Sequence, residues 1–509
     1  MLLGITHKLN NMLPKIITFL ETRGNILSKL QTRINEHDYL NLWVECGASG
    51  DSYIINTPQA VTRSLSPDHI RQILNINGIQ YYNDFDNDQF SKNYEMLIFE
   101  RSALFIKQKI KGKNGGHSQY IEEEQCKKIV DVAKRVIYLL GLDYGMVHLG
   151  LTPNKKIHVL SVNDSPLLSD IESNSLFAEI LRVIDSISQV GSKEIKMGAD
   201  PEFMLSNAKN GQMIPASQFF PREGIVGCDS IRMPNRQQRP VAELRPKPDY
   251  SPLQLLSNLS QAMQTANKLV PYRHVKWLAG SRPFNGYSLG GHIHFSNVDL
   301  NNHILRALDT YIGLPLFLIE NQATAVKRRD KYGFLADYRP KEYGGFEYRT
   351  PGSWLVSPQI AAATLCLAKI VASNYLKLTR NCFLSSEAQR AFYSGNQDYL
   401  KILFNDVWAD IQKLDMYLAY EDKLKIIYDM IKNNRKWEEK EDIRKTWAIT
   451  IAPKKKNSLT KTDTGSTHSR NETTYQNGAH NPERNQRSPR FNRIRNSGPV
   501  YISSQRFYN

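Results

Sequence analysis

The segments GADPEF (198–203), VAELRP (241–246), GGHIHF (290–295) and GFEYRT (345–350) repeat one unusual pattern along the middle of the chain. Each segment places two ionisable side chains at positions i and i+2. Side chains two residues apart leave the same face of a β-strand. The four segments therefore predict four strands that present one shared polar face, within the stretch from Lys196 to Trp354.

This polar face combines carboxylates, imidazoles and guanidinium groups. Charged side chains are costly to bury unless they find partners, and a cleft that holds metal ions and phosphates would supply them. Carboxylate oxygens suit hard cations such as Mg2+, which bridges to substrate phosphates. An arginine two residues from a carboxylate can form two parallel hydrogen bonds with a phosphate or a carboxylate. The residue types therefore fit phosphoryl-transfer chemistry.

The order of the motifs resembles a known superfamily. An acidic pair, Glu-x-Arg, Gly-Gly-His-x-His and an arginine-rich loop that ends in Gly-x-Glu-Tyr-Arg follow one another in this chain. This series resembles the glutamine-synthetase-like carboxylate-amine ligases, and most of all the phage-type carboxylate-amine (COOH-NH2) ligases, or amidoligases. The resemblance covers roughly residues 194–375. It implies an α+β fold in which helices pack on an antiparallel glutamine-synthetase-like sheet.

The resemblance also implies roles for individual residues. The implied metal ligands are acidic and imidazole side chains of the four strands: Asp200, Glu202, Glu243, His292 and Glu347. The implied contacts to the nucleotide are His294, Arg328 and Arg339, and the implied catalytic arginines, which contact phosphate or the carboxylate substrate, are Arg245, Arg339 and Arg349. Plainer alternatives are solvated strand carboxylates, a surface His-x-His strand, and Arg245 as a structural partner of Glu243.

The activity implied by the resemblance is ATP-dependent formation of an amide or peptide bond through an acyl phosphate. The cofactors would be ATP and Mg2+, with Mn2+ as an alternative, and the substrates a small-molecule or peptide carboxylate and an amine. A guanidino-kinase-like phosphotransferase is the enzymatic alternative, because that group is similar in core architecture. A non-catalytic nucleotide-binding or docking protein is the alternative from another class.

The N-terminal part resembles a smaller, degenerate ATP-grasp-like domain. A helix over 122–140 and strands over 144–151 and 156–162, which end in Asn163-Asp164-Ser165-Pro166, resemble the final third of that fold. Asn163 matches the metal-binding asparagine, but Ser161 stands where a metal-binding glutamate is usual. Only about forty residues separate Gln59 from Glu100, too few for a complete nucleotide-binding subdomain. Apolar spacings of three and four also predict helix in the first forty residues.

These observations divide the chain into four predicted parts. They are an ATP-grasp-like domain (1–180), a carboxylate-amine ligase core (190–383), a helical accessory segment (384–452) and a disordered basic tail (453–509). The core should contain helices over 251–269, 302–320 and 358–376, and the accessory segment two or three more. The tail carries eleven basic and three acidic residues, half of the formal net charge of +16. Nucleic-acid binding by the tail is an option that we do not favour.

The composition indicates the number of domains, the cellular location and the state of the cysteines. A chain of 509 residues with 41% apolar residues is long enough for two or three domains. No run approaches 18 uninterrupted apolar residues and the N-terminus shows no cleavage signal, so we expect a cytoplasmic protein that is not held in a membrane. The five cysteines show no C-x-x-C spacing and are expected to be reduced thiols. The sequence leaves the oligomeric state open.

Overall fold

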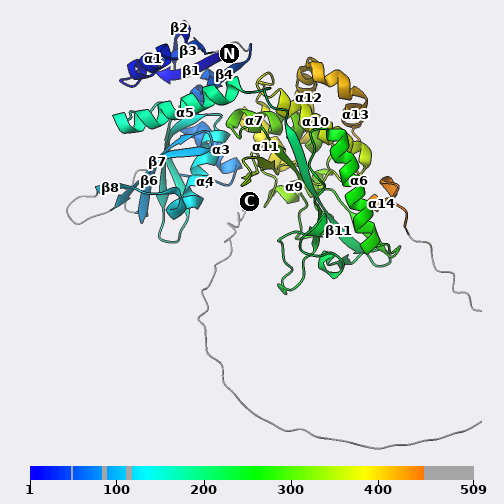
Figure 1. The fold of residues 1–509 in the computed structure, drawn as a ribbon. Helices are drawn as coiled ribbons and strands as arrows, with labels where there is room; N and C mark the ends of the chain where they lie inside the picture. Colours follow the sequence, from blue (N-terminus) through cyan, green and yellow to red (C-terminus); the bar gives the residue numbers. More distant parts are fainter. Residues whose placement is uncertain (47–49, 83–88, 111–116, 452–509) are drawn as a thin grey trace, which may run out of the picture. The chain divides into compact units, whose positions relative to one another are not determined.

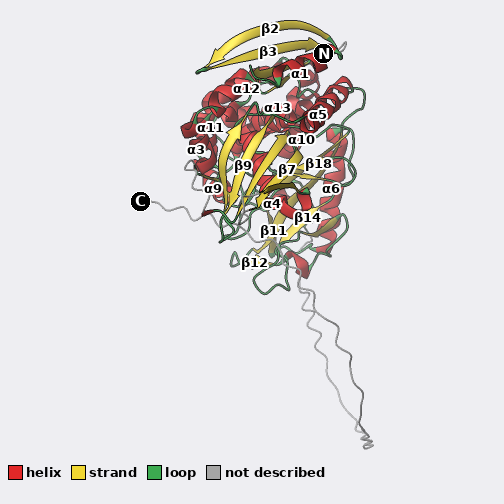
Figure 2. Cartoon of the chain, turned by 90° about the vertical axis from the view of Figure 1, so that its left-hand side faces the viewer, coloured by secondary structure: helices red, strands yellow, loops and turns green. Residues whose placement is uncertain are grey.

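Three sheets organise the chain in the computed structural model, which describes residues 1–46, 50–82, 89–110 and 117–451 (Figure 1). The first sheet has the order β2-β3-β1-β4. Its strands are β1 (Leu2–Lys8), β2 (Asn25–Ile34), β3 (His37–Glu45) and β4 (Ser52–Ile55), with helix α1 (Leu13–Glu21) between β1 and β2. In Figure 2 the hairpin of β2 and β3 lies at the edge of the described fold.

The prediction of helix through the first forty residues is wrong outside α1. Ile26, Leu27 and Leu30 lie on β2, where Leu27 and Leu30 are 56% and 62% exposed. The pairing of β2 with β3 shifts register between Ile26 and Ser28, so that Leu27 is an extra residue in a bulge. The bulge breaks the two-residue alternation of the strand and leaves a spacing that imitates a helix.

The second sheet has the order β5-β10-β9-β6-β7-β8. Its strands are β5 (Gln80–Tyr81), β6 (Lys92–Phe99), β7 (Ser102–Ile110), β8 (His117–Tyr120), β9 (Tyr144–Leu151) and β10 (Ile157–Asn163). The helices of this part are α2 (Pro58–Ser64), α3 (Pro67–Ile76), α4 (Glu123–Leu139) and α5 (Asp170–Ser188). The helix and the two strands predicted between residues 122 and 162 are confirmed.

The third sheet contains all four polar segments as neighbours. Its main path is β13-β14-β11-β16-β18-β17, and β12 and β15 pair with β11. The strands are β11 (Lys196–Asn207), β12 (Met213–Ile214), β13 (Val226–Cys228), β14 (Val241–Leu244), β15 (Val275–Leu278), β16 (Gly291–Ser296), β17 (Tyr338–Pro340) and β18 (Phe346–Tyr348). All pairings in this sheet are antiparallel. The predicted antiparallel sheet and α+β class are confirmed.

Strand β11 separates an apolar side of this sheet from a polar one. The odd-numbered residues Met197, Ala199, Phe203 and Leu205 are buried apolar residues, and Phe203 stacks on Trp277 with ring centroids 4.8 Å apart. Asp200 and Glu202 leave the opposite face because side chains alternate along a strand. Helix α6 (Pro252–Leu269) is capped by Ser251, whose side chain accepts from the Gln254 N–H.

Further helices complete the fold (Figures 1 and 2). They are α7 (Asn302–Leu308), α8 (Leu314–Ile319), α9 (Gln322–Arg329), α10 (Pro358–Ser373), α11 (Ser386–Ser394), α12 (Gln397–Gln412), α13 (Asp415–Lys432) and α14 (Ile443–Thr446), with short 3-10 turns η2 (Ala216–Gln218) and η4 (Cys382–Leu384). The helix predicted over 302–320 is interrupted by the π-helical turn η3 (Asp309–Gly313). Pro315 follows this turn and has no N–H for the regular ladder. Residues 384–451 contain four helices, α11 to α14, where two or three were predicted.

Several general expectations can be compared with the described residues. All five cysteines are free thiols, as predicted. None of the described helices is long and apolar enough to cross a membrane. Residues 1–452 form one compact unit, and the division into functional domains stays a prediction. The basic tail over 453–509 lies outside the described residues.

Candidate active site

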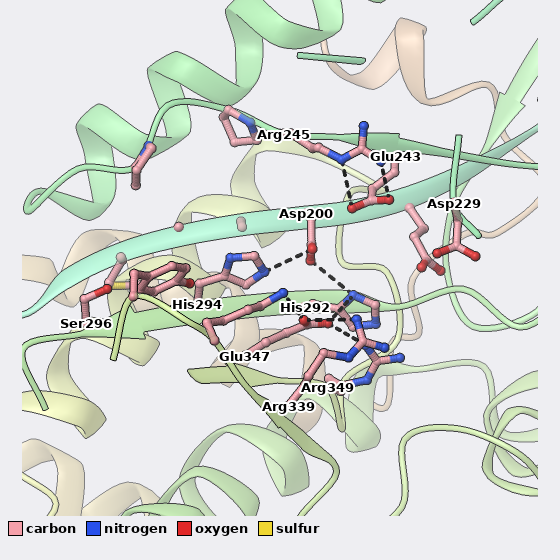
Figure 3. A pocket seen from close by; sticks show the side chains of 18 of the residues that line it. Asp200, Asp229, Glu243, Arg245, His292, His294, Ser296, Arg339, Glu347 and Arg349 are labelled. Carbon is pink, nitrogen blue, oxygen red and sulfur yellow. Dashed lines mark hydrogen bonds and ion pairs between the residues drawn. The ribbon is translucent and has the colours of Figure 1, made fainter. Parts of the chain in front are cut away.

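The polar face of the third sheet opens into a cavity of about 710 Å3 (Figure 3). Its walls come from β11, β14, β16, β18 and the segment that contains β17. Of the residues predicted from sequence, those that line it are Asp200, Glu202, Glu243, Arg245, His292, His294, Arg339, Glu347 and Arg349. Arg328 is the one predicted site residue that does not line it.

Strand register brings the first group of possible metal ligands together. His292 lies directly opposite Asp200, and Glu347 lies directly opposite His294. One ligand atom each from Asp200, His294 and Glu347 can be chosen so that the three atoms lie within 4.8 Å of one another. His292 Nδ1 adds a further nitrogen at 3.1 Å from Asp200 and 3.2 Å from Glu347. Two carboxylates and two imidazoles around one point are a donor set that fits a divalent cation.

Gly290 shapes the approach to this group. A Cβ added at Gly290 would lie 2.0 Å from His292 Nε2, so a side chain there would displace the imidazole. The Gly290 N–H donates to Glu202 Oε2 at 2.7 Å and fixes that carboxylate as well. The first glycine of the Gly-Gly-His-x-His motif therefore positions one imidazole and one carboxylate.

Glu347 is fully buried and surrounded by cations. Its carboxylate accepts from Arg349 Nη1 at 2.5 Å, lies 3.5 Å from Arg339 Nη1, and forms an ion pair with Lys341. Burial alone would raise the pKa of Glu347, but His292, Arg349 and Lys341 outweigh it and lower the pKa below the usual value. Glu347 is therefore held as a carboxylate.

The same balance acts on Asp200. Burial would raise the pKa of Asp200, but His294 and His292 hold it well below its ordinary value. His294 Nε2 lies 3.0 Å from Asp200 Oδ2 (Figure 3). Asp200 is therefore also ionised and available as an oxygen ligand.

A second carboxylate group lies at the other end of the cavity. Glu202 and Glu243 are directly opposed on β11 and β14, and Asp229, just after β13, lies at the same end (Figure 3). Burial, together with the charge of Asp229, raises the pKa of Glu202 well above its usual value. Burial, with the charge of Asp200, raises the pKa of Glu243 to about 8 despite its pairing with Arg245. Without a bound cation, burial and mutual repulsion therefore favour the protonated, neutral form of Glu202 and Glu243 at neutral pH.

The predicted arginines fall into three different surroundings. Arg245 forms a bidentate ion pair with Glu243, with Nη2–Oε2 at 2.9 Å and Nε–Oε1 at 3.3 Å. This pairing agrees with the alternative that Arg245 is a structural partner of Glu243. Arg339 has a side chain that is 58% exposed at the cavity. Arg328 is buried away from the cavity and donates to the carbonyls of Leu289, Thr350 and Arg349. The structure does not bring Arg328 to the predicted nucleotide site.

Sequence reasoning missed several residues that line the cavity. They are Lys196, Arg222, Asp229, Ser296, Lys341 and Tyr343. Lys341 follows Arg339 at i+2, so the spacing used for the four main segments would have found it. Asp229 gave no such signal, because β13 is only three residues long and offers no alternation to recognise.

Comparison with known proteins concerns mainly the part of the chain that holds this cavity. Residues 197–449 match the family described as phage phiEco32-like COOH.NH2 ligase-type 2. A search of curated proteins found no match. The cavity residues that were predicted from sequence all lie within the matched range.

Solved structures resemble the chain only weakly. The ATP-grasp ligase PsnB in complex with a minimal precursor aligns with a TM-score of 0.21 and 11% identity over 26% of this chain, and the alignment spans 63% of the PsnB chain. A bifunctional glutathione synthetase from Pasteurella multocida gives 0.31 and 12%, covering 50% of this chain and 48% of that one. Macrocyclase MdnC bound with precursor peptide MdnA, from Microcystis aeruginosa MRC, gives 0.24 and 10%, covering 35% and 97%. TM-scores of this size do not argue for a shared fold, so the ATP-grasp-like domain stays a prediction.

Proposed function

We propose, from the premise that residues 197–449 belong to the phage phiEco32-like COOH.NH2 ligase-type 2 family, that this protein is an ATP-dependent ligase that joins a carboxylate to an amine. The observation that carries the proposal is the convergence of Asp200, His294 and Glu347, from three neighbouring strands, on one point of a cavity. The cavity volume lies in the range that holds a nucleotide-sized ligand.

The proposal places divalent cations at two ends of the cavity. Asp200, His292, His294 and Glu347 would hold one ion. A second ion at the other end would be held by Glu202 and Glu243, which lie opposite each other, with Asp229, and it would favour their ionised form. Mg2+ bound there would neutralise phosphate charge and draw the reacting groups together. Some of the cations that now surround Glu347 would then become available for phosphate oxygens.

The reaction we propose has two steps. The substrate carboxylate takes the terminal phosphoryl group of ATP, and ADP leaves. The amine then attacks the carbonyl carbon of the acyl phosphate, phosphate leaves, and the nitrogen loses a proton to give the amide. In this proposal Arg339 and Arg349, which line the cavity, hold phosphate oxygens, and Arg245 is paired with Glu243 of the second carboxylate group. Positioning and charge neutralisation supply most of the rate in chemistry of this kind.

The direct test is product analysis by mass spectrometry. The protein would be incubated with ATP, Mg2+ and pooled amino acids or peptides, with ADP followed in parallel. We expect ADP formation that depends on both an amine and a carboxylate, and a product lighter by one water than the sum of its substrates.

Variants of two carboxylates sharpen this test. Glu243→Gln and Glu347→Gln should each lower amine-dependent ADP formation at least about a hundredfold, because each replaces a carboxylate that would bind a proposed ion with a neutral amide. Glu342→Gln is the matched control, since Glu342 is an exposed neighbour that does not line the cavity.

Other outcomes would point to the alternatives. ADP release together with a stable phosphorylated product and no need for an amine would identify a phosphotransferase. Binding of Mg-ATP without turnover by any substrate pool would identify a non-catalytic nucleotide-binding protein. Full activity in both glutamine variants would reject the site.

A further inference from the structure

A hairpin over 229–240, between β13 and β14, leaves the cavity at the end that holds the second carboxylate group. Its first two residues, Asp229 and Ser230, line the cavity. Arg239 ties the returning arm to them, because its Nη1 donates to the Asp229 and Ser230 carbonyls at 3.2 Å and 2.8 Å. The hairpin is therefore an extension of the cavity wall.

The hairpin is held in one conformation by its own hydrogen bonds. The Ile231 N–H donates to Asp229 Oδ1 at 2.7 Å, and the Met233 N–H donates to the Gln238 carbonyl at 2.9 Å. At the tip, Asn235 Oδ1 accepts from two backbone N–H groups, and Arg236 has the left-handed φ of 58° that a tight turn requires. A surface ordered before binding loses little conformational entropy when it binds.

The outer half of this hairpin carries positive charge without neutralising partners. Arg232 and Arg236 are exposed, and within the described residues neither forms an ion pair with a carboxylate. Among the described residues, the ion-pair partner of Arg222, which lines the cavity, is the exposed Glu223 at 3.8 Å, and Arg222 Nη1 also donates to the Cys228 carbonyl. Asp229 is the single acidic residue of the hairpin and lies at the cavity (Figure 3). Cationic side chains thus continue from the hairpin tip to the cavity.

We propose that this arginine hairpin, residues 229–240, binds an acidic peptide segment and leads one of its carboxylates into the cavity. The proposal rests on the proposed ligase function and names its carboxylate substrate as a peptide rich in Asp or Glu. Guanidinium groups recognise carboxylates through two parallel hydrogen bonds. A peptide with further carboxylates beside the reacting one would engage Arg222, Arg232 and Arg236 in turn.

The composition of this region favours a peptide over a nucleic acid. Residues 222–245 contain no Phe, Tyr or Trp. Single-stranded nucleic acids are usually held by aromatic side chains on which the bases stack, together with basic ones. The hairpin offers charge and planar donors without a stacking surface.

The test is direct binding of a fluorescein-labelled hexaglutamate peptide to the full chain, measured by anisotropy without ATP or metal. Arg232→Glu/Arg236→Glu should weaken binding about tenfold or more at low salt, because two attractive contacts become repulsive, and the loss should shrink as salt rises. Arg232→Gln/Arg236→Gln should give an intermediate loss. Labelled hexalysine should bind the wild type more weakly than hexaglutamate.

Two matched variants and one competing probe decide the outcome. Lys127→Glu/Lys128→Glu reverses two exposed charges on α4, and Lys454→Glu/Lys455→Glu reverses two charges of the tail. Weakening by the hairpin variant alone supports the proposal. Equal weakening by all three variants, or by the tail variant only, overturns it, as does a hairpin variant that loses binding of labelled oligothymidylate but keeps hexaglutamate.

This binding result is independent of turnover. If the ligase assignment fails while the hairpin variant still loses hexaglutamate, the hairpin is a peptide-binding surface without the proposed chemistry. If Mg-ATP-dependent ligation is found but the hairpin variant binds hexaglutamate as tightly as the wild type, only the substrate assignment fails. An unchanged circular dichroism spectrum and unfolding midpoint would show that the exposed substitutions leave the fold intact.

Discussion

The role of an individual residue in this chain depends on its surroundings as well as on its chemical type. Arg328 was predicted to contact nucleotide, yet its guanidinium joins the carbonyl of Leu289, just before the Gly-Gly-His-x-His strand, to those of Arg349 and Thr350, just after β18. It therefore holds two strands that carry cavity residues. Burial lowers the pKa of Arg328 to about 10, which still leaves it charged at neutral pH.

Replacing Arg328 should cost stability before it costs chemistry. Arg328→Met leaves three buried carbonyls without a donor, and we expect a loss of about 3–5 kcal/mol in the free energy of unfolding. Arg328→Lys should lose less, since an ammonium reaches some of these carbonyls. Chemical denaturation would measure both, with exposed Lys327→Met as the control. A loss near zero would show that water can replace the guanidinium.

Glu100 makes a pH-dependent contribution to stability. It is buried in the turn between β6 and β7, where burial and then the charge of Asp143 raise its pKa from 4.5 to about 8. Its carboxyl is thus protonated in the folded protein at pH values where the unfolded chain is already ionised. The stability from this group is fully present below 4.5 and is lost as pH rises towards about 8.

Glu100→Gln removes this titration and keeps the shape. Relative to wild type, the variant should gain unfolding free energy by up to about 1.4 kcal/mol for each pH unit between about pH 5 and pH 8. Urea unfolding across that range would test this, and Glu122→Gln, an exposed acid, should show no such trend. A constant difference between Glu100→Gln and wild type would mean that Glu100 is ionised in the fold.

At the scale of elements, sequence periodicity found the strands that matter. The i, i+2 pairs placed ionisable side chains on β11, β14, β16 and β18, and the sheet makes these strands neighbours. The pattern worked because one face of these strands is polar and the other apolar. It could not give the order of strands or the register, which depend on pairings between residues far apart in sequence.

The sequence predictions that were wrong or missing also have local causes. A bulge at Leu27 gave a strand the spacing of a helix, and β13 was too short to show any period. The arginine side chains of the site could not be assigned from spacing, since burial decides whether a guanidinium faces a ligand or backbone carbonyls. Arg339 is exposed at the cavity, whereas Arg328 is buried and donates to backbone carbonyls.

Helix α5 depends on the capping box at its start. The Ser169 hydroxyl accepts from the Glu172 N–H at 3.4 Å, and Glu172 Oε2 accepts from the Ser169 N–H at 2.8 Å. Ser169→Ala should therefore lower the unfolding free energy by about 1 kcal/mol. Ser175→Ala, within the same helix, should be neutral or slightly stabilising. Thermal unfolding of the two variants would separate the cap from a general effect of removing a hydroxyl.

On the scale of the whole molecule, buried polar contacts join the part with the second sheet to the part that contains the cavity. Arg306 Nη1 of α7 lies 2.7 Å from Asp143 Oδ1, and Arg306 Nη2 donates to the Leu142 carbonyl at 2.7 Å. Tyr138 OH donates to Asp309 Oδ2 at 2.8 Å across the same junction. Charged and hydroxyl groups thus add specific buried contacts to the apolar core that both parts share.

A double-mutant cycle would measure this junction. Arg306→Met should cost about 3–5 kcal/mol because it leaves Asp143 charged and buried without its partner, and Asp143→Asn should cost less. The double variant should lose less than the sum of the two single losses, which denaturant unfolding can quantify. Strict additivity would show that the pair is not coupled in solution.

Strand β11 pairs with β12, β14, β15 and β16, and supplies both Asp200 and Glu202. Inserting or deleting one residue ahead of Asp200 would turn both carboxylates towards the helices and their apolar neighbours towards the cavity. Related chains should therefore vary freely in the length of the 229–240 hairpin but keep the length of β11. Over evolutionary time the alternation of even and odd positions in β11 should preserve the polar lining of the cavity, while the hairpin, and with it the proposed peptide partner, can change.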